Sequence, residues 1–178
     1  MNIPNILTII RIILIPVYLY VFYNTKNIFY AGLIFALAGL TDALDGRIAR
    51  KYNMTSKVGA ALDPLADKLM TFAVLISFTS IDLIPHWVVL ILGIKEILMI
   101  LGGLILYLFK EKRVLPSNKF GKSATVSFYV TISAIVLKVP SPELIKLLII
   151  LTVSLNIIAF LNYLRIFLFN NSDEEFIR

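Results

Sequence analysis

The sequence predicts an all-α, polytopic membrane protein of about six transmembrane helices, with the N- and C-termini in the cytoplasm. Three features lead to this prediction: an apolar composition, long apolar segments and an uneven distribution of basic residues. Of the 178 residues 59% are hydrophobic, and the mean hydropathy is +0.89. Soluble domains carry about 45–50% apolar residues. A core of this size could not bury the excess, so lipid must surround much of the chain.

Six apolar segments approach the roughly 20 residues that a spanning helix needs. They are Ile6–Tyr23, Ile28–Ala49, Val58–Ser80, Trp87–Phe109, Ala124–Val139 and Pro142–Phe169. Pro85, Pro116, Pro140 and Pro142 fall in or beside the connections, where helices are expected to end. No repeat or linker divides the sequence, so residues 1–178 are expected to form a single membrane domain.

The basic residues predict the orientation. The net charge of +6 comes from 17 basic and 11 acidic residues, and the basic ones gather in two connections. These are Arg47, Arg50, Lys51 and Lys57 after the second segment, and Lys110, Lys112, Arg113, Lys119 and Lys122 after the fourth. Because cytoplasmic loops carry the excess of Lys and Arg, both loops and both termini are expected on the cytoplasmic side of the plasma membrane. No aromatic-plus-basic pattern indicates a nucleic-acid partner.

Ionisable residues concentrate where the second segment ends and the third begins. Such residues cost about 2.5–3.5 kcal/mol each inside a spanning segment, so they are usually functional or paired. Helical spacing places them on two stripes. The first stripe is Asp42, Asp45, Gly46 and Arg50, and the second is Gly59, Asp63 and Asp67. At 1.5 Å per residue both stripes reach about 12 Å inside the same boundary, so the two carboxylate pairs are expected to meet.

Carboxylates at such close quarters need a cation, because like charges raise each other's pKa. Oxygen ligands without His or Cys favour Mg²⁺ or Mn²⁺, and the donor set suits one or two ions. Gly46 and Gly59 would leave room for a ligand, and Arg50 could hold a phosphate. The cysteine-free sequence excludes thiolate sites and disulfides.

Two alternatives remain for these aspartates. They could pair with Arg47, Arg50 and Lys68 merely to fasten the helices together. They could instead line a cation channel or a proton pathway, since acidic rings line pores. A pore would not explain the paired glycines or the arginine at fixed spacing, so an enzyme site is the favoured interpretation.

The motif Asp42-x-x-Asp45-Gly46-x-x-Ala49-Arg50, followed after eight residues by Gly59-x-x-x-Asp63-x-x-x-Asp67, resembles the signature of the CDP-alcohol phosphotransferase family. The resemblance implies transfer of a phospho-alcohol from a CDP-linked donor to an acceptor hydroxyl, with release of CMP, by a homodimer. It further implies that the four aspartates hold divalent metal and that Asp67 is the general base. The donor-binding residues that it implies are Asp42, Asp45, Gly46, Arg50, Gly59 and Asp63.

The N-terminal run Pro4-Asn5-x-Leu7-Thr8-x-x-Arg11-x-x-x-x-Pro16 resembles the phosphatidylglycerophosphate synthase branch of that family, and the related CMP-forming cardiolipin synthases. This implies CDP-diacylglycerol as donor, and glycerol 3-phosphate or phosphatidylglycerol as acceptor. Arg11 could reach a phosphate of either substrate. Alternatively, it is an interfacial arginine that extends its charge toward water.

Two departures from the branch pattern bear on the acceptor. Lys95-Glu96 stands where Arg-Glu is usual, with Gly102 near the place of a further arginine, and Ala124 replaces a lysine of the segment after the fourth helix. Fewer cations would then hold an acceptor phosphate, which keeps phosphatidylglycerol open.

Glycerol 3-phosphate is still favoured, because four cations remain for its phosphate: Arg11, Lys95, Lys119 and Lys122. Lys95 and Glu96 could instead form an intramembrane ion pair without a ligand. Lys119 and Lys122 could simply follow the bias toward basic cytoplasmic loops.

Overall fold

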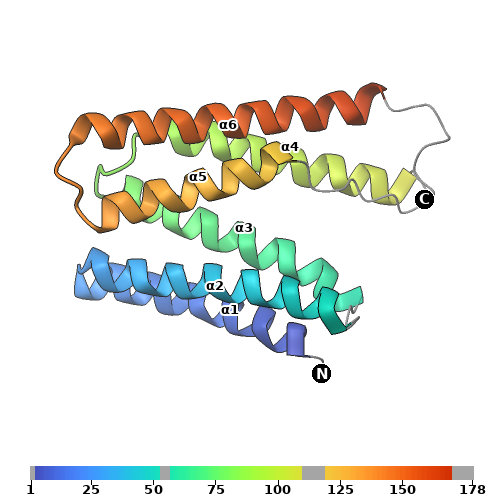
Figure 1. The fold of residues 1–178 in the computed structure, drawn as a ribbon, viewed down its shortest axis with the longest axis horizontal. Helices are drawn as coiled ribbons and strands as arrows, with labels where there is room; N and C mark the ends of the chain where they lie inside the picture. The colour runs from blue at the N-terminus through green and yellow to red at the C-terminus, as the bar shows by residue number, and fades with distance from the viewer. Residues whose placement is uncertain (1–2, 53–56, 110–118, 170–178) are drawn as a thin grey trace. The chain divides into compact units, whose positions relative to one another are not determined.

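The computed structural model describes residues 3–52, 57–109 and 119–169, which form six α-helices and one π-helical turn without a strand among them (Figure 1). The elements are α1 (Ile3–Tyr20), η1 (Val21–Thr25), α2 (Ile28–Tyr52), α3 (Lys57–Thr79), α4 (His86–Phe109), α5 (Lys119–Val136) and α6 (Pro142–Phe169). Within these helices, the side chains of residues 3–5, 43, 45–52, 57–61, 63–64, 103–109, 119 and 166–169 lie outside the description. The all-α prediction is confirmed.

Each predicted segment corresponds to one helix, but the predicted bounds of the fifth were wrong. We expected Ala124–Val139, whereas α5 runs from Lys119 to Val136. An apolar segment marks only the part of a helix that lipid can cover. The backbone continues in helical geometry through the polar residues 119–123. The first segment also extends differently, because α1 begins at Ile3 and continues into the η1 turn.

The ends of α3 and α5 share one backbone motif, which explains why the chain turns there. Asp82 and Lys138 adopt left-handed conformations, with φ of 58° and 51°. In each case the N–H of the following residue donates to a carbonyl at the end of the helix, at 3.0 and 3.1 Å. This arrangement satisfies carbonyls that the helix leaves without partners, and proline commonly follows it. Pro85 and Pro140 follow here, in the connections after Thr79 and Val136, where the prolines were predicted to lie.

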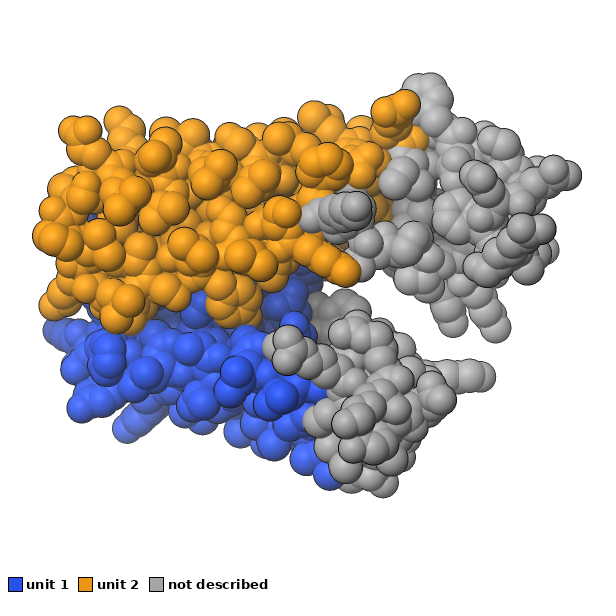
Figure 2. All heavy atoms as spheres, in the orientation of Figure 1, with its two compact units in different colours: residues 1–85 blue, residues 86–178 orange. Residues whose placement is uncertain are grey.

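The chain divides into two compact units, Met1–Pro85 and His86–Arg178 (Figure 2). In unit 1, α1 contacts both α2 and α3. The buried face of α1 carries Thr8, Arg11 and Tyr18, and Phe22 of η1 continues this face at heptad-like spacing. The ring of Phe22 packs against Phe78 of α3, with centroids 5.8 Å apart. Arg11 therefore points into the interior of unit 1.

In unit 2, α6 contacts both α4 and α5. Hydroxyl groups join α5 to α6: Thr152 Oγ1 lies 2.7 Å from Ser127 Oγ and 2.8 Å from Thr131 Oγ1. All three side chains are buried. Buried hydroxyls need partners, and each finds one across this helical hairpin.

Two helical stretches within the described residues, Ile6–Thr25 and Pro142–Arg165, are long and apolar enough to cross a membrane, as expected of a membrane protein. Ile28–Asp42 and Phe120–Val136 are shorter apolar helical stretches. Helix α4 buries Val88 and Leu92 on one face, yet it exposes Leu90, Ile94 and Ile97 on another. A helix that is apolar all round suits a protein interior or lipid, and the exposed face of α4 therefore suits lipid.

Candidate active site

An ion pair between α1 and α2 lies at the centre of the candidate site in unit 1. Arg11 Nη1 is 2.9 Å from Asp42 Oδ1, and the two side chains are 1% and 46% exposed, respectively. The guanidinium of Arg11 thus contacts the carboxylate of Asp42 from the buried side, and the rest of the carboxylate is exposed. The planar fork of an arginine fixes the direction of a carboxylate better than a lysine would. Asp42 is therefore held in place while it remains accessible to a ligand.

The structure changes the interpretation of Arg11. The alternative of an interfacial arginine is wrong, because the side chain is buried among residues of unit 1. The predicted role in binding a phosphate is not tested. The new observation is the partner: Arg11 contacts the first aspartate of the motif, which the sequence does not reveal.

Asp67 lies on α3, next to the buried face that Ala66 and Met70 form. Its side chain is partly exposed. The hydroxyl of Thr71 donates to the main-chain carbonyl of Asp67 at 3.0 Å. That bond involves the backbone of Asp67 rather than its carboxylate.

The remaining motif residues lie on the expected helices. Asp45, Gly46 and Arg50 are in α2, and Gly59 and Asp63 are in α3, with side chains outside the described part of the structure. Among the described residues no group of three or more acidic, His or Cys side chains forms a metal site. The convergence of four carboxylates therefore stays a prediction.

The helix arrangement bears on that prediction. Helix α2 contacts α3, and α1 contacts both. Asp42 is as far from Tyr52, where α2 ends, as Asp67 is from Lys57, where α3 begins. Helical rise is constant, so the two aspartates lie at the same distance from these ends of their own helices. A shared depth inside the membrane stays a prediction.

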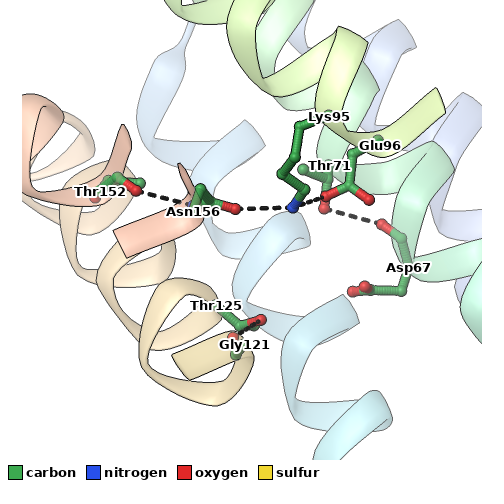
Figure 3. Close-up of polar contacts among 8 residues, drawn as sticks. All are labelled: Asp67, Thr71, Lys95, Glu96, Gly121, Thr125, Thr152 and Asn156. Atoms are coloured by element: carbon green, nitrogen blue, oxygen red, sulfur yellow. Dashed lines mark hydrogen bonds and ion pairs between the residues drawn. The ribbon is translucent and has the colours of Figure 1, made fainter. Parts of the chain in front are cut away.

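Lys95 lies in unit 2 within a buried polar chain (Figure 3). Its ammonium Nζ is 2.5 Å from Glu96 Oε1 and donates to Asn156 Oδ1 of α6 at 2.9 Å. The side chains of Lys95 and Glu96 are only 11% and 8% exposed. The predicted ion pair of Lys95 and Glu96 is confirmed, and a role in binding the acceptor stays a prediction.

The other two predicted phosphate ligands lie on α5. Lys122 is exposed, and the side chain of Lys119 is outside the described residues. Neither position distinguishes a ligand from a basic residue of a cytoplasmic loop.

Four buried polar residues of unit 2 were missed by the sequence analysis: Ser127, Thr131, Thr152 and Asn156. A signal was available, because each pair occurs four residues apart within an apolar segment. That spacing places both members on one side of a helix. Polar side chains at such positions usually find partners on a neighbouring helix.

Comparison with known proteins identifies the class. The chain belongs to the CDP-alcohol phosphatidyltransferase family, whose family model matches residues 1–162. That match includes the whole of unit 1 and most of unit 2.

Several relatives are similar over much of the chain. A candidate cardiolipin synthase of Mycobacterium tuberculosis is 36% identical over 137 residues, which are 77% of this chain and 65% of that protein. The chain thus spans slightly less than two thirds of the length of this mycobacterial relative. The CDP-diacylglycerol–glycerol-3-phosphate 3-phosphatidyltransferase of Rickettsia felis is 35% identical over 162 residues, 90% of this chain and 88% of that protein. A protein of the same name from Aquifex aeolicus is 39% identical over 129 residues, 71% of this chain and 70% of that protein.

Proposed function

We propose that this protein is a membrane-bound phosphatidyltransferase that moves the phosphatidyl group of CDP-diacylglycerol to glycerol 3-phosphate, releasing phosphatidylglycerophosphate and CMP. The observation that carries the proposal is the Arg11–Asp42 pair. It holds the first motif aspartate from the buried side and leaves its carboxylate open, in a chain that belongs to a family of phosphatidyltransferases. The Rickettsia and Aquifex relatives, named for this reaction, support the choice of substrates.

The proposed metal ligands are Asp42, Asp45, Asp63 and Asp67. Carboxylates alone fit Mg²⁺ or Mn²⁺, and one or two ions suit the set. The open carboxylate of Asp42, aligned by Arg11, fits this role. A bound ion supplies positive charge beside the diphosphate of the donor. Arg50 is proposed to contact the same diphosphate, and Gly46 and Gly59 to let it approach the helices.

Asp67 is the proposed general base. Its carboxylate accepts the proton of the acceptor hydroxyl as that oxygen bonds to the β-phosphorus of the donor. The bond between this phosphorus and the oxygen of CMP breaks, and CMP leaves with the electron pair. The proton that Asp67 takes up is afterwards released to water.

Lys95, Lys119 and Lys122 are the proposed ligands of the acceptor phosphate. Arg11 was grouped with them, but its buried contact with Asp42 supports a place beside the metal-binding aspartates instead. Phosphatidylglycerol is the second candidate acceptor, supported by the mycobacterial relative named for cardiolipin synthesis. It also carries a phosphate that these lysines could contact.

We further propose that the two units work as one catalytic domain of a homodimer in the plasma membrane, because the family match runs through both units. Six spanning helices would place both termini and the site on the cytoplasmic side. The chain contains no cysteine, so single-cysteine variants can be labelled without background. Membrane-impermeant reagents should label residue 51 only from inside the cell and residue 138 only from outside. The opposite pattern would contradict the orientation.

The test of the function uses the purified full chain in detergent with labelled CDP-diacylglycerol, Mg²⁺ and each acceptor in turn. We expect CMP with glycerol 3-phosphate and none after removal of divalent ions with EDTA. CMP with phosphatidylglycerol alone would identify the cardiolipin reaction. No CMP with either acceptor would overturn the proposal, and ion flux in vesicles would then favour the channel interpretation.

A further inference from the structure

Helices α4 and α6 form a parallel seam in constant register. Lys95 and Asn156 are bonded 61 residues apart. Gly102 and Tyr163, which face each other further along, keep the same interval. The buried residues before these pairs follow heptad-like spacing on both helices. They are Val88 and Leu92 on α4, and Ile149 and Val153 on α6.

Within this apolar seam, Lys95 and Asn156 form a polar layer. A polar residue at one core position of paired helices fixes their register, because any shift would leave it without its partner. The layer therefore sets how far α4 and α6 slide along each other. It also sets the depth at which the Lys95 ammonium lies.

Asn156 is held at both ends of its amide. Its Oδ1 accepts from Lys95 Nζ at 2.9 Å, and its Nδ2 donates to the main-chain carbonyl of Thr152 at 2.9 Å. The side chain is 8% exposed. Since the amide has one acceptor end and one donor end, a flip would break both bonds. Asn156 thus offers Lys95 one fixed oxygen.

Glu96 and Asn156, which both contact Lys95, differ in charge. Glu96 is an anion, and it would be repelled by a phosphate that approached the same ammonium. The amide of Asn156 is neutral, so it can keep its bond to Lys95 while a phosphate binds. Glu96 balances the charge of Lys95 without substrate, and Asn156 keeps the ammonium in place when substrate arrives.

We propose that Asn156 is a positioning residue, which holds the Lys95 ammonium at the place where the phosphate of the acceptor binds. This inference rests on the proposed function and adds to it a residue outside the aspartate motif. Asn156 itself does not contact the reacting atoms. It acts on the affinity for the acceptor through Lys95.

The test compares two neighbouring variants of the purified chain, with the acceptor that supports turnover in the wild type. Asn156→Ala removes the bond to Lys95. We expect it to raise the KM of the acceptor about tenfold, the usual effect of losing one hydrogen bond to a charged group. The KM of CDP-diacylglycerol should stay within about twofold.

Thr152→Val is the matched control. It removes a buried hydroxyl one turn away but keeps the carbonyl that receives the Asn156 amide. It should lower the thermal stability and leave both KM values within about twofold. If both variants changed both KM values alike, the role of Asn156 would be purely structural and the inference would be wrong.

Asn156→Asp decides the matter if Asn156→Ala does not fold. The carboxylate has the same shape and pairs with Lys95, but it competes with phosphate, so the KM of the acceptor should again rise about tenfold. An unchanged acceptor KM in either variant contradicts the inference. Failure of the proposed function would be recognised separately, as the absence of CMP from the wild-type protein.

Discussion

Among the described residues, each unit of the molecule has a charged pair inside its helical packing, and the pairs Arg11–Asp42 and Lys95–Glu96 are built differently. In unit 1 the pair joins two helices, and its carboxylate, Asp42, is 46% exposed. In unit 2 the pair joins neighbouring residues of α4; Glu96 is buried, and the side chain of Lys95 is only 11% exposed. A neutral amide from α6, that of Asn156, completes the second site.

The difference shows how burial decides what an ion pair can do. A carboxylate that is open on one side can exchange water for a metal or a ligand without breaking its contact with Arg11. A pair that is buried on both sides must give up one partner before an anion can bind. Unit 1 is therefore suited to chemistry that needs a fixed, open carboxylate. Unit 2 is suited to binding that exchanges one counterion for another.

The largest effect is expected for Asp67→Asn in unit 1. Loss of the general base should lower kcat by about 10²–10⁴-fold while the KM of CDP-diacylglycerol changes little. CMP release under saturating substrates measures it.

Asp82→Asn is the control, because Asp82 lies in the turn after α3, in a left-handed conformation that asparagine also tolerates. It should keep turnover within about twofold. Full turnover by Asp67→Asn would exclude Asp67 as the base. It would also contradict the assignment of the chemical step to unit 1.

The next largest effect is expected for the largely buried Lys95–Glu96 pair of unit 2. Lys95→Met and Glu96→Gln should each lower the free energy of unfolding by about 3–5 kcal/mol, because either change removes a counterion from the other, largely buried charge. The double variant should recover much of this loss. Thermal unfolding in detergent, arranged as a double-mutant cycle, measures the coupling. Additive losses would mean that Lys95 and Glu96 do not depend on each other.

The sequence predicts the helices well, since apolar length and prolines such as Pro85 and Pro140 are local signals. The motif aspartates were also visible, because acids are rare inside apolar segments. The partner of Arg11 was not visible. Asp42 lies on another helix, and helical spacing relates residues of one helix only.

Asn156, the neutral member of the polar chain in unit 2, was missed for a related reason. Asn156 has no charge, so it stands out less than Lys95 in an apolar sequence. Its importance comes from the parallel register of α4 and α6, which is a property of packing. Motif reasoning finds charged residues that act together within one segment. It does not find the neutral residues that hold them from a distant one.

A smaller effect is expected for the Arg11–Asp42 pair of unit 1, whose carboxylate is partly exposed. Asp42→Asn removes the negative charge that Asp42 places beside the buried Arg11, so it should cost about 1.5–3 kcal/mol of unfolding free energy. Arg11→Met leaves a carboxylate that water can reach and places an apolar side chain in the interior, so its cost should stay below about 1 kcal/mol. Both variants should lose activity. The 1% exposure of Arg11 and the 46% exposure of Asp42 imply a larger loss of stability for Asp42→Asn than for Arg11→Met, and equal losses would contradict this.

The smallest effect probes how closely α4 and α6 approach beyond the polar layer. A Cβ at Gly102 would lie 3.7 Å from Tyr163 Cε1 and 3.9 Å from its Oη, which is ordinary contact. Gly102→Ala should therefore stabilise the protein by about 0.5–1 kcal/mol, since glycine weakens a helix interior. Gly102→Leu should instead cost about 1–3 kcal/mol, because the larger side chain meets the tyrosine ring. If Gly102→Ala lowered the stability instead, α4 and α6 would approach each other more closely at Gly102 than the 3.7 Å contact indicates.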